Sequence, residues 1–222
     1  MQHTADVIVI GAGMVGAATA CMLARALTAE AIKVIPRKPV ESGCQRQGQE
    51  LIASDALALK NAANYPGDLN LVCPYRFEPA ISPDRAARLA NTALNIEQLK
   101  AACLNEVNPD TDFLLVEGAG GFYSPMCSDG LNADLAQALD LPVVLVAEDR
   151  LGCINHILLS LETISARRLA IQAVILNPIH NDPSIDLDMN NFLDLKKLID
   201  LPVYSLKNNA KDSIKNCIKS LI

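Results

Sequence analysis

The sequence predicts an α/β fold built on a doubly wound, mostly parallel sheet. Short apolar runs alternate with helical patterns along the 222 residues, and this strand–helix order is typical of parallel sheets. Half of the residues are hydrophobic, Trp is absent and aromatic residues make up only 4%, so the core must consist mainly of Leu, Ile, Val and Ala. Aliphatic strands of this kind suit a sheet that helices cover on both faces. No repeat or linker-like stretch interrupts the chain, which predicts one domain over residues 1–222.

The elements are expected in the following order. A buried strand at residues 6–11 precedes an Ala- and Leu-rich helix at residues 17–31. A second strand is expected at residues 33–40, where prolines limit its pairing. Residues 64–88 contain several prolines and little periodicity, which predicts a long functional loop. Further strands are expected at 112–118, 142–148, 171–177 and 201–206, and helices at 96–106, 131–139 and 154–167.

Composition also narrows the cellular setting. The net charge of −6 argues against nucleic acid or an anionic membrane as the main partner. The seven cysteines are odd in number and form no CxxC pair, which is typical of reduced, cytosolic proteins. Residues 7–24 carry no charge, but Asp6 rather than a basic residue precedes them and glycines interrupt them. A signal peptide or membrane span is therefore not expected, and we predict a cytoplasmic protein.

The residues after each strand are the candidates for function, because ligands bind at the carboxyl ends of strands in such sheets. "RKPVESG" follows the second strand, and its Lys38 and Ser42 could meet a phosphate or a carboxylate. A solvated strand end is the alternative. "VEGAGG" follows the third, and Glu117 occupies the place of a magnesium ligand in nucleotide-hydrolysing folds. A glycine-rich turn with a solvated Glu is the alternative there.

Two helix starts add further candidates. Asp55 begins a helix and is either a capping carboxylate or a second oxygen ligand beside Glu117. "RLGCINH", residues 150–156, opens another helix, whose amide groups would form an anion site. An ordinary helix start with a buried Cys153 is the alternative.

The order of these motifs closely resembles dethiobiotin synthetase. The resemblance runs from about residue 33 to residue 206 and includes "SDALAL", "PYRFEPAISP", "ADLAQALDLPVVLV" and "AVILNP", with "VEGAGG" and "LGCINH" the most characteristic motifs. It implies a P-loop NTPase-like domain that acts as a homodimer. It also implies an ATP- and Mg²⁺-dependent ligase that closes the ureido ring of dethiobiotin from 7,8-diaminononanoate and CO₂ through a phosphorylated carbamate.

The resemblance also implies individual roles. Lys38 would be the catalytic lysine and Ser42 a substrate contact. Asp55 and Glu117 would hold magnesium. The ATP site would be formed by Gly13, Gly16, Asp55, Glu117, Gly118, Ala119, Gly120, Asn177 and Pro178, with the last two at the adenine. The substrate carboxylate would be received across the dimer interface by Gly152, Cys153 and Asn155.

The first loop departs from this pattern. The family has a Walker-type loop ending in Gly-Lys-Thr, whereas residues 16–19 here read Gly-Ala-Ala-Thr and no lysine lies between residues 1 and 31. "DVIVIGAGMVGAATA" instead resembles the opening of flavin-dependent oxidoreductases, with Gly11, Gly13 and Gly16 at dinucleotide-binding spacing. The acidic residue expected after the second strand is missing, since Arg37 and Lys38 stand there. Three interpretations stay open: a synthetase of reduced activity, a catalytically impaired homologue, and an FAD- or NAD-binding protein.

Overall fold

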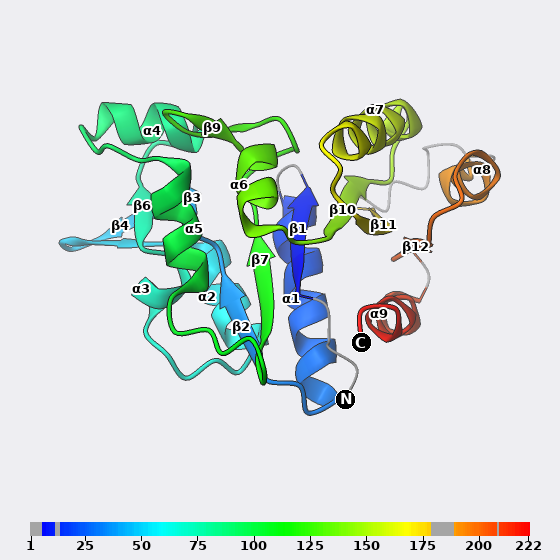
Figure 1. The fold of residues 1–222 in the computed structure, drawn as a ribbon, viewed down its shortest axis with the longest axis horizontal. Coiled ribbons are helices and arrows are strands. Elements are labelled where there is room, and N and C mark those ends of the chain that lie inside the picture. The colour runs from blue at the N-terminus through cyan, green and yellow to red at the C-terminus, as the bar shows by residue number, and fades with distance from the viewer. Residues whose placement is uncertain (1–5, 12–13, 179–188, 208) are drawn as a thin grey trace.

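A six-stranded sheet forms the centre of the computed structural model, which describes residues 6–11, 14–178, 189–207 and 209–222. Every pairing between its neighbouring strands is parallel (Figure 1). From one edge to the other, the strands are β12 (Val203–Ser205), β11 (Ile171–Asn177), β10 (Val143–Glu148), β1 (Val7–Gly11), β7 (Phe113–Glu117) and β2 (Val34–Arg37). The predicted fold class is confirmed.

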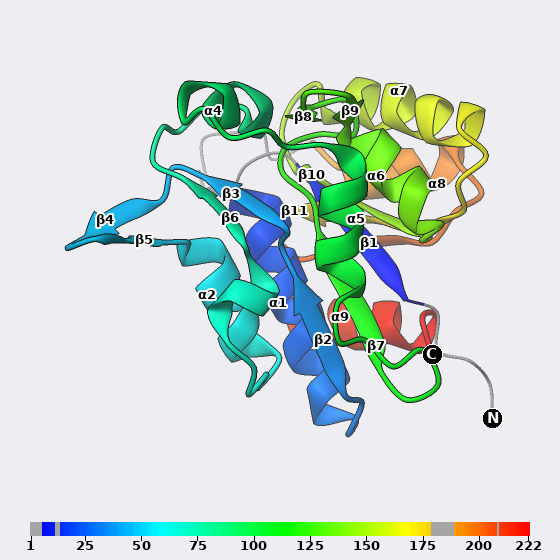
Figure 2. The same ribbon diagram turned by 60° about the vertical axis from the view of Figure 1, so that its left-hand side comes forward.

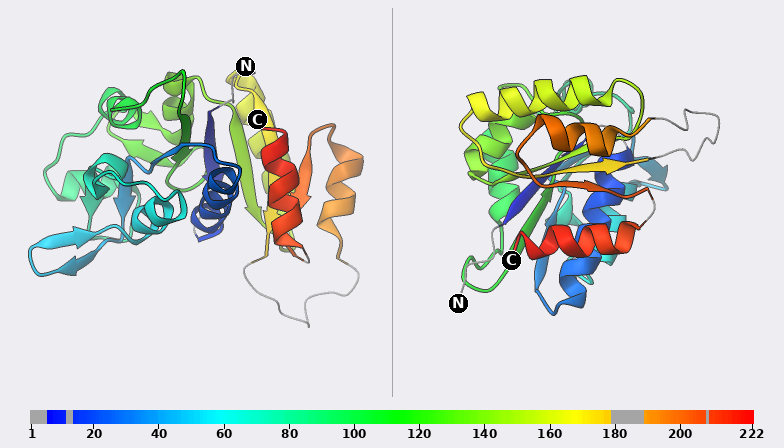
Figure 3. Two further views of the ribbon diagram at one scale, coloured as in Figure 1. Left: turned by 90° about the horizontal axis from the view of Figure 1, so that it is seen from below. Right: turned by 90° about the vertical axis from the view of Figure 1, so that its right-hand side faces the viewer.

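Helices cover both faces of this sheet (Figure 3). One face packs against α1 (Met14–Ala29), α2 (Ser54–Ala62) and α9 (Ala210–Lys219). The other packs against α5 (Ile96–Leu104), α6 (Asn132–Leu139), α7 (Cys153–Ala166) and α8 (Asn191–Leu198).

Alternate residues of strand β1 contribute to the hydrophobic cores on the two faces of the sheet. Val7 and Val9 belong to the core beneath α1, whereas Ile8 and Ile10 belong to the core beneath α7. All four side chains are fully buried. Burial of each is worth about 1.5–3 kcal/mol. Strand β1 and most of helix α1 lie within the uncharged segment 7–24. Among the described residues, no helix is both long and apolar enough to cross a bilayer.

The predicted strand at residues 33–40 is divided in two. β2 ends at Arg37, and β3 (Val40–Ser42) pairs instead with β6 (Tyr75–Phe77) in a separate two-stranded sheet. Proline lacks the N–H that a ladder needs, so Pro36 is tolerated on the edge strand β2 and Pro39 separates the two strands. The break leaves Lys38 just beyond the sheet, with its backbone N–H donating to Val72 O at 2.9 Å.

The prediction of one long loop at residues 64–88 is wrong. This stretch contains α3 (Leu69–Val72) and β6, and α4 (Pro83–Leu89) begins within it. These pieces are too short to show periodicity, and local signals start the two helices: Asp68 caps α3, and Pro83 occupies the first turn of α4. Two small hairpins complete the fold, β4 (Gln45–Gln47) with β5 (Glu50–Ile52) and β8 (Pro125–Cys127) with β9 (Gly130–Leu131) (Figure 2).

Candidate active site

A cavity of about 140 Å³ lies at the carboxyl rim of the sheet, where four separate segments of the chain meet. Strands β1 and β7 end there, the β2–β3 junction crosses it, and α2 begins beside it. The residues that line it are Gly11, Lys38, Glu41, Ser42, Asp55, Glu117, Gly118, Ala119 and Gly120. Lys38, Asp55 and Glu117, which the sequence places at one predicted site, are brought together by the fold.

The centre of the cavity is a buried ion pair. Lys38 Nζ lies 2.5 Å from Glu117 Oε1 and 3.8 Å from Asp55 Oδ2, and it also donates to Gly118 O at 3.5 Å. Lys38 is only 4% exposed and Glu117 3%, whereas the Asp55 side chain is 47% exposed. The lysine ammonium thus lies between the two predicted metal ligands.

The two buried partners titrate abnormally. Burial disfavours the charged form of Lys38. The attraction and hydrogen bond of Glu117, together with attraction by Asp55 and Glu41, outweigh burial, so the pKa of Lys38 is raised. Burial also raises the pKa of Glu117, and the nearby Lys38 ammonium offsets only part of that increase. Lys38 is therefore positively charged at neutral pH and lies at the carboxyl rim of the sheet.

The carboxylates suit Mg²⁺ in their chemistry. Within the described parts of the chain, the buried Glu117 Oε2 has no hydrogen-bond partner, although buried oxygens normally have one. Mg²⁺ prefers hard oxygen ligands and binds through one or two protein carboxylates together with phosphates and waters. Among the described residues, no group of three or more His, Cys, Asp or Glu is arranged around a metal position. A two-carboxylate site completed by a nucleotide fits this donor set.

The loop after β7 depends on glycine and on a residue that the sequence analysis missed. A Cβ on Gly118 would lie 2.5 Å from Asn132 Oδ1, and Gly120 has a φ of +82° that side chains rarely adopt. The buried Asn132 donates from Nδ2 to the carbonyls of Ala119 and Gly120 at 3.2 and 3.3 Å. An asparagine at the start of a predicted helix was the available signal, but no spacing rule connects it to the earlier loop.

Ser42 lines the cavity at the end of β3. Its hydroxyl donates to Ile81 O at 2.6 Å and keeps acceptor capacity toward the cavity. The predicted contact between Ser42 and substrate stays a prediction.

The first loop brings α1 very close to β1. A Cβ on Gly16 would lie 2.8 Å from Gly11 O, so glycine is needed for this close packing, as in dinucleotide-binding folds. Gly13 lies outside the described residues. Thr19 is fully buried and accepts a hydrogen bond from Asn177 Nδ2 at 3.0 Å, so this threonine is part of the core contact between α1 and β11.

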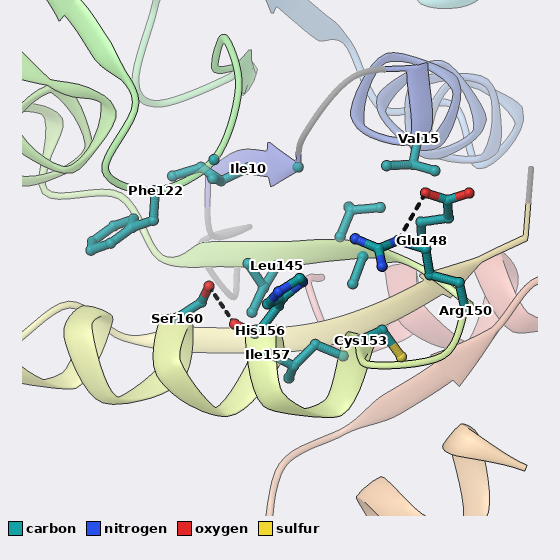
Figure 4. A pocket seen from close by; sticks show the side chains of 14 residues that line it. Ile10, Val15, Phe122, Leu145, Glu148, Arg150, Cys153, His156, Ile157 and Ser160 are labelled. Atoms are coloured by element: carbon teal, nitrogen blue, oxygen red, sulfur yellow. Dashed lines mark hydrogen bonds and ion pairs between the residues drawn. The ribbon is translucent and has the colours of Figure 1, made fainter.

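The start of α7 lies apart from the Lys38 cavity. Gly152 precedes the helix with a φ of +86°, Cys153 is buried, and Asn155 is exposed. Cys153 lines a second cavity of about 280 Å³ between α7 and the ends of β1 and β10. Figure 4 shows this cavity with apolar side chains such as Phe122 on one side and the Glu148–Arg150 ion pair on another. The predicted substrate-carboxylate residues are therefore not joined to Lys38 within one chain.

Comparisons with known proteins agree with this architecture. A family model described as an AAA domain matches residues 5–207. The ATP-dependent dethiobiotin synthetase BioD of Ruthia magnifica subsp. Calyptogena magnifica is 35% identical over 196 residues, which cover 88% of this chain and 87% of that protein. The protein of the same name from Pseudomonas paraeruginosa is 41% identical over 165 residues, 74% of this chain and 72% of its own.

Among solved structures, the MinC:MinD cell division complex of Aquifex aeolicus matches with a TM-score of 0.51 at 14% identity. The match covers 96% of this chain and 86% of that one. At this identity the likeness concerns the fold alone.

Proposed function

The chain belongs to the dethiobiotin synthetase family, and we propose that it closes the ureido ring of dethiobiotin from 7,8-diaminononanoate, CO₂ and ATP at the Lys38 cavity. It is an ATP-dependent ligase of biotin biosynthesis. The observation that most supports this site is the convergence of Lys38, Glu117 and Asp55 on one cavity at the carboxyl rim of the sheet.

The chemistry requires neutralisation of charge more than acid–base catalysis. One amine of the substrate takes up CO₂ to form a carbamate, whose oxygen is then phosphorylated by ATP. The second amine attacks the carbamoyl carbon, the ring closes, and phosphate leaves. Lys38, a fixed ammonium at the rim, would stabilise the negative charge that develops on the transferred phosphoryl group. Ser42 would orient the carbamate beside it.

We assign the remaining ligands on the same basis. Asp55 and Glu117 would hold Mg²⁺, which when bound offsets phosphate charge. Gly118, Ala119 and Gly120 would let the nucleotide approach the backbone, together with the first loop at Gly13 and Gly16. Asn177 and Pro178 would meet the adenine at the end of β11.

A homodimer would complete the site. Gly152 and Asn155 are exposed at the start of α7 and lie outside the Lys38 cavity of their own chain. We propose that they, with Cys153, receive the substrate carboxylate of a partner subunit. The amide groups at this helix start would supply the positive end of the helix dipole.

One observation favours a second candidate, dinucleotide binding. The close approach of Gly16 to Gly11 is the packing that an FAD- or NAD-binding turn requires. Against it, β2 ends in the buried Arg37, where that site needs an acidic residue for the ribose. A flavoprotein would be yellow when purified, so a colourless preparation removes the flavin alternative.

The deciding experiment measures phosphate release from ATP with the diamine and bicarbonate added singly and together. The proposed function requires release only when both are present, and Lys38→Ala should abolish it. A chain that binds the diamine but never releases phosphate would be the catalytically impaired homologue.

A second measurement tests the lysine-free loop. Ala18 is exposed on the first turns of α1, so Ala18→Lys can be introduced without burying a charge, and Ala18→Gln is the matched neutral control. A gain in turnover with lysine but not with glutamine would identify the missing loop cation as the limit on rate.

A further inference from the structure

The geometry points to Glu41 as a positioning residue that holds Asp55 in place for metal-dependent nucleotide binding. This inference rests on the proposed function and adds a residue that the sequence motifs do not assign. Glu41 lines the cavity beside Lys38 and Asp55. Its side chain is directed to the beginning of α2 rather than left free for a ligand.

Helix α2 has no cap of its own. Ala53 occupies the N-cap position and offers no side-chain hydrogen bond to the first turn. Glu41 supplies this contact from β3: its Oε1 accepts from Asp55 N at 3.1 Å and its Oε2 from Ala56 N at 2.9 Å. The Ser54 hydroxyl also lies 3.5 Å from Oε1. One carboxylate thus satisfies two of the orphan amides that every helix start leaves.

The arrangement indicates positioning rather than metal ligation. Glu41 is 4% exposed and both of its oxygens are engaged with α2. A carboxylate at a helix start is also favoured by the helix dipole, so the contact is charge-assisted. The backbone N–H of Asp55 donates to Glu41, and this contact fixes the position of the Asp55 carboxylate.

Asp55 has little else to fix it. Its side chain is 47% exposed, and Lys38 at 3.8 Å is its ion-pair contact among the described residues. The body of α2 is anchored further along by Ala56, Leu59 and Ala62, which are buried. Loss of the Glu41 contact should therefore fray the first turn of α2 without unfolding the helix. A frayed turn would leave Asp55 free to move relative to Glu117.

The test compares Glu41→Ala and Glu41→Gln with Asn95→Ala. Asn95 caps α5, accepts from Gln98 N at 2.9 Å, and does not line the cavity, so its loss is a matched cap removal elsewhere. Amide hydrogen exchange of residues 54–58 reports the helix start, and calorimetric ATP titrations at a series of Mg²⁺ concentrations report the metal dependence of nucleotide binding.

We expect Glu41→Ala to speed exchange in residues 54–58 and to raise the Mg²⁺ concentration at half-maximal ATP binding by about tenfold, the usual effect of removing a group that orients a metal ligand. Glu41→Gln keeps one acceptor oxygen and should lie between. Asn95→Ala should change neither quantity.

The outcomes separate the two proposals. A wild-type chain that binds ATP with a Mg²⁺ midpoint unchanged by Glu41→Ala would overturn the role of Glu41 while leaving the proposed function standing. A wild-type chain that fails to bind ATP with Mg²⁺ would overturn the proposed function and this inference with it.

Discussion

Replacement of Lys38 by methionine tests the central ion pair through stability alone. Lys38 and Glu117 are almost fully buried and 2.5 Å apart, so Lys38→Met leaves a buried carboxylate without its cation. Breaking a buried pair in this way costs about 3–5 kcal/mol of unfolding free energy. Glu117 can reduce that cost by taking up a proton, because burial already raises its pKa in the intact protein.

The sign of the pH effect follows from this shift. When the folded pKa of an acid lies above the unfolded value of about 4.3, the folded state binds the proton more tightly. The stability that such an acid contributes is complete at pH values below its unfolded pKa and is lost as the pH rises through its folded pKa. The Lys38→Met chain should therefore be most destabilised near pH 8, and its deficit should shrink by at most about 1.4 kcal/mol per pH unit on acidification.

Urea unfolding at pH 8 and at pH 6 measures this difference. Lys38→Met/Glu117→Gln should recover most of the lost stability, because both charges are then absent. Lys33→Met is the matched control: Lys33 is 67% exposed, and its partner Asp112 also accepts from Asn108 N at 2.9 Å. A deficit for Lys38→Met that is the same at both pH values, or a double variant as unstable as the single one, would refute the reasoning.

Three further outcomes follow from the packing. Gly16→Ala should lower the unfolding free energy by about 1–3 kcal/mol, measured with urea, because its methyl group would meet Gly11 O. Thr19→Val should cost about 1–3 kcal/mol, because Asn177 Nδ2 would lose its 3.0 Å acceptor and keep only the long 3.5 Å contact to Val15 O; a loss under 0.5 kcal/mol would contradict this. The cysteines should not react with an aromatic disulfide at pH 8 until urea is added, since all seven are buried and burial raises the pKa of Cys103 to about 12.

The sheet could be predicted because its central strands β1, β7 and β10 consist almost entirely of apolar residues. The strand at residues 171–177 was predicted with the limits that β11 has in the structure. The rim residues followed from a rule of topology: the carboxyl ends of parallel strands lie at one edge, so Lys38 and Glu117 were expected at the same edge. The pairing of β2 with β7 then brings them next to each other. Asp55 was assigned correctly to a helix start for a local reason, its position before an apolar pattern.

What the sequence left open was set by contacts between distant segments. Glu41 reaches α2 across 14 residues, and Thr19 meets Asn177 across 158. Hydrophobic periodicity does not predict such pairs, because they depend on how the helices pack against the sheet. The break between β2 and β3 was not predicted, although Pro39 lies at this position. A proline limits the pairing of a strand but does not determine which segment the following residues pair with.

The balance of charge in the cavity explains why the metal matters for the proposed function. The described lining residues include three carboxylates, Glu41, Asp55 and Glu117, and one ammonium, Lys38. A polyphosphate entering this cavity would therefore meet an excess of negative charge. In the family, the first loop contributes a second lysine, and residues 1–31 of this chain contain none. With a divalent cation held by Asp55 and Glu117, this excess of negative charge would be cancelled, and Lys38 would remain as a cation near the phosphates. ATP binding should accordingly depend more steeply on Mg²⁺ concentration than it would in a chain whose first loop carries a lysine. The metal titration is therefore a more direct test of this site than a measurement of turnover.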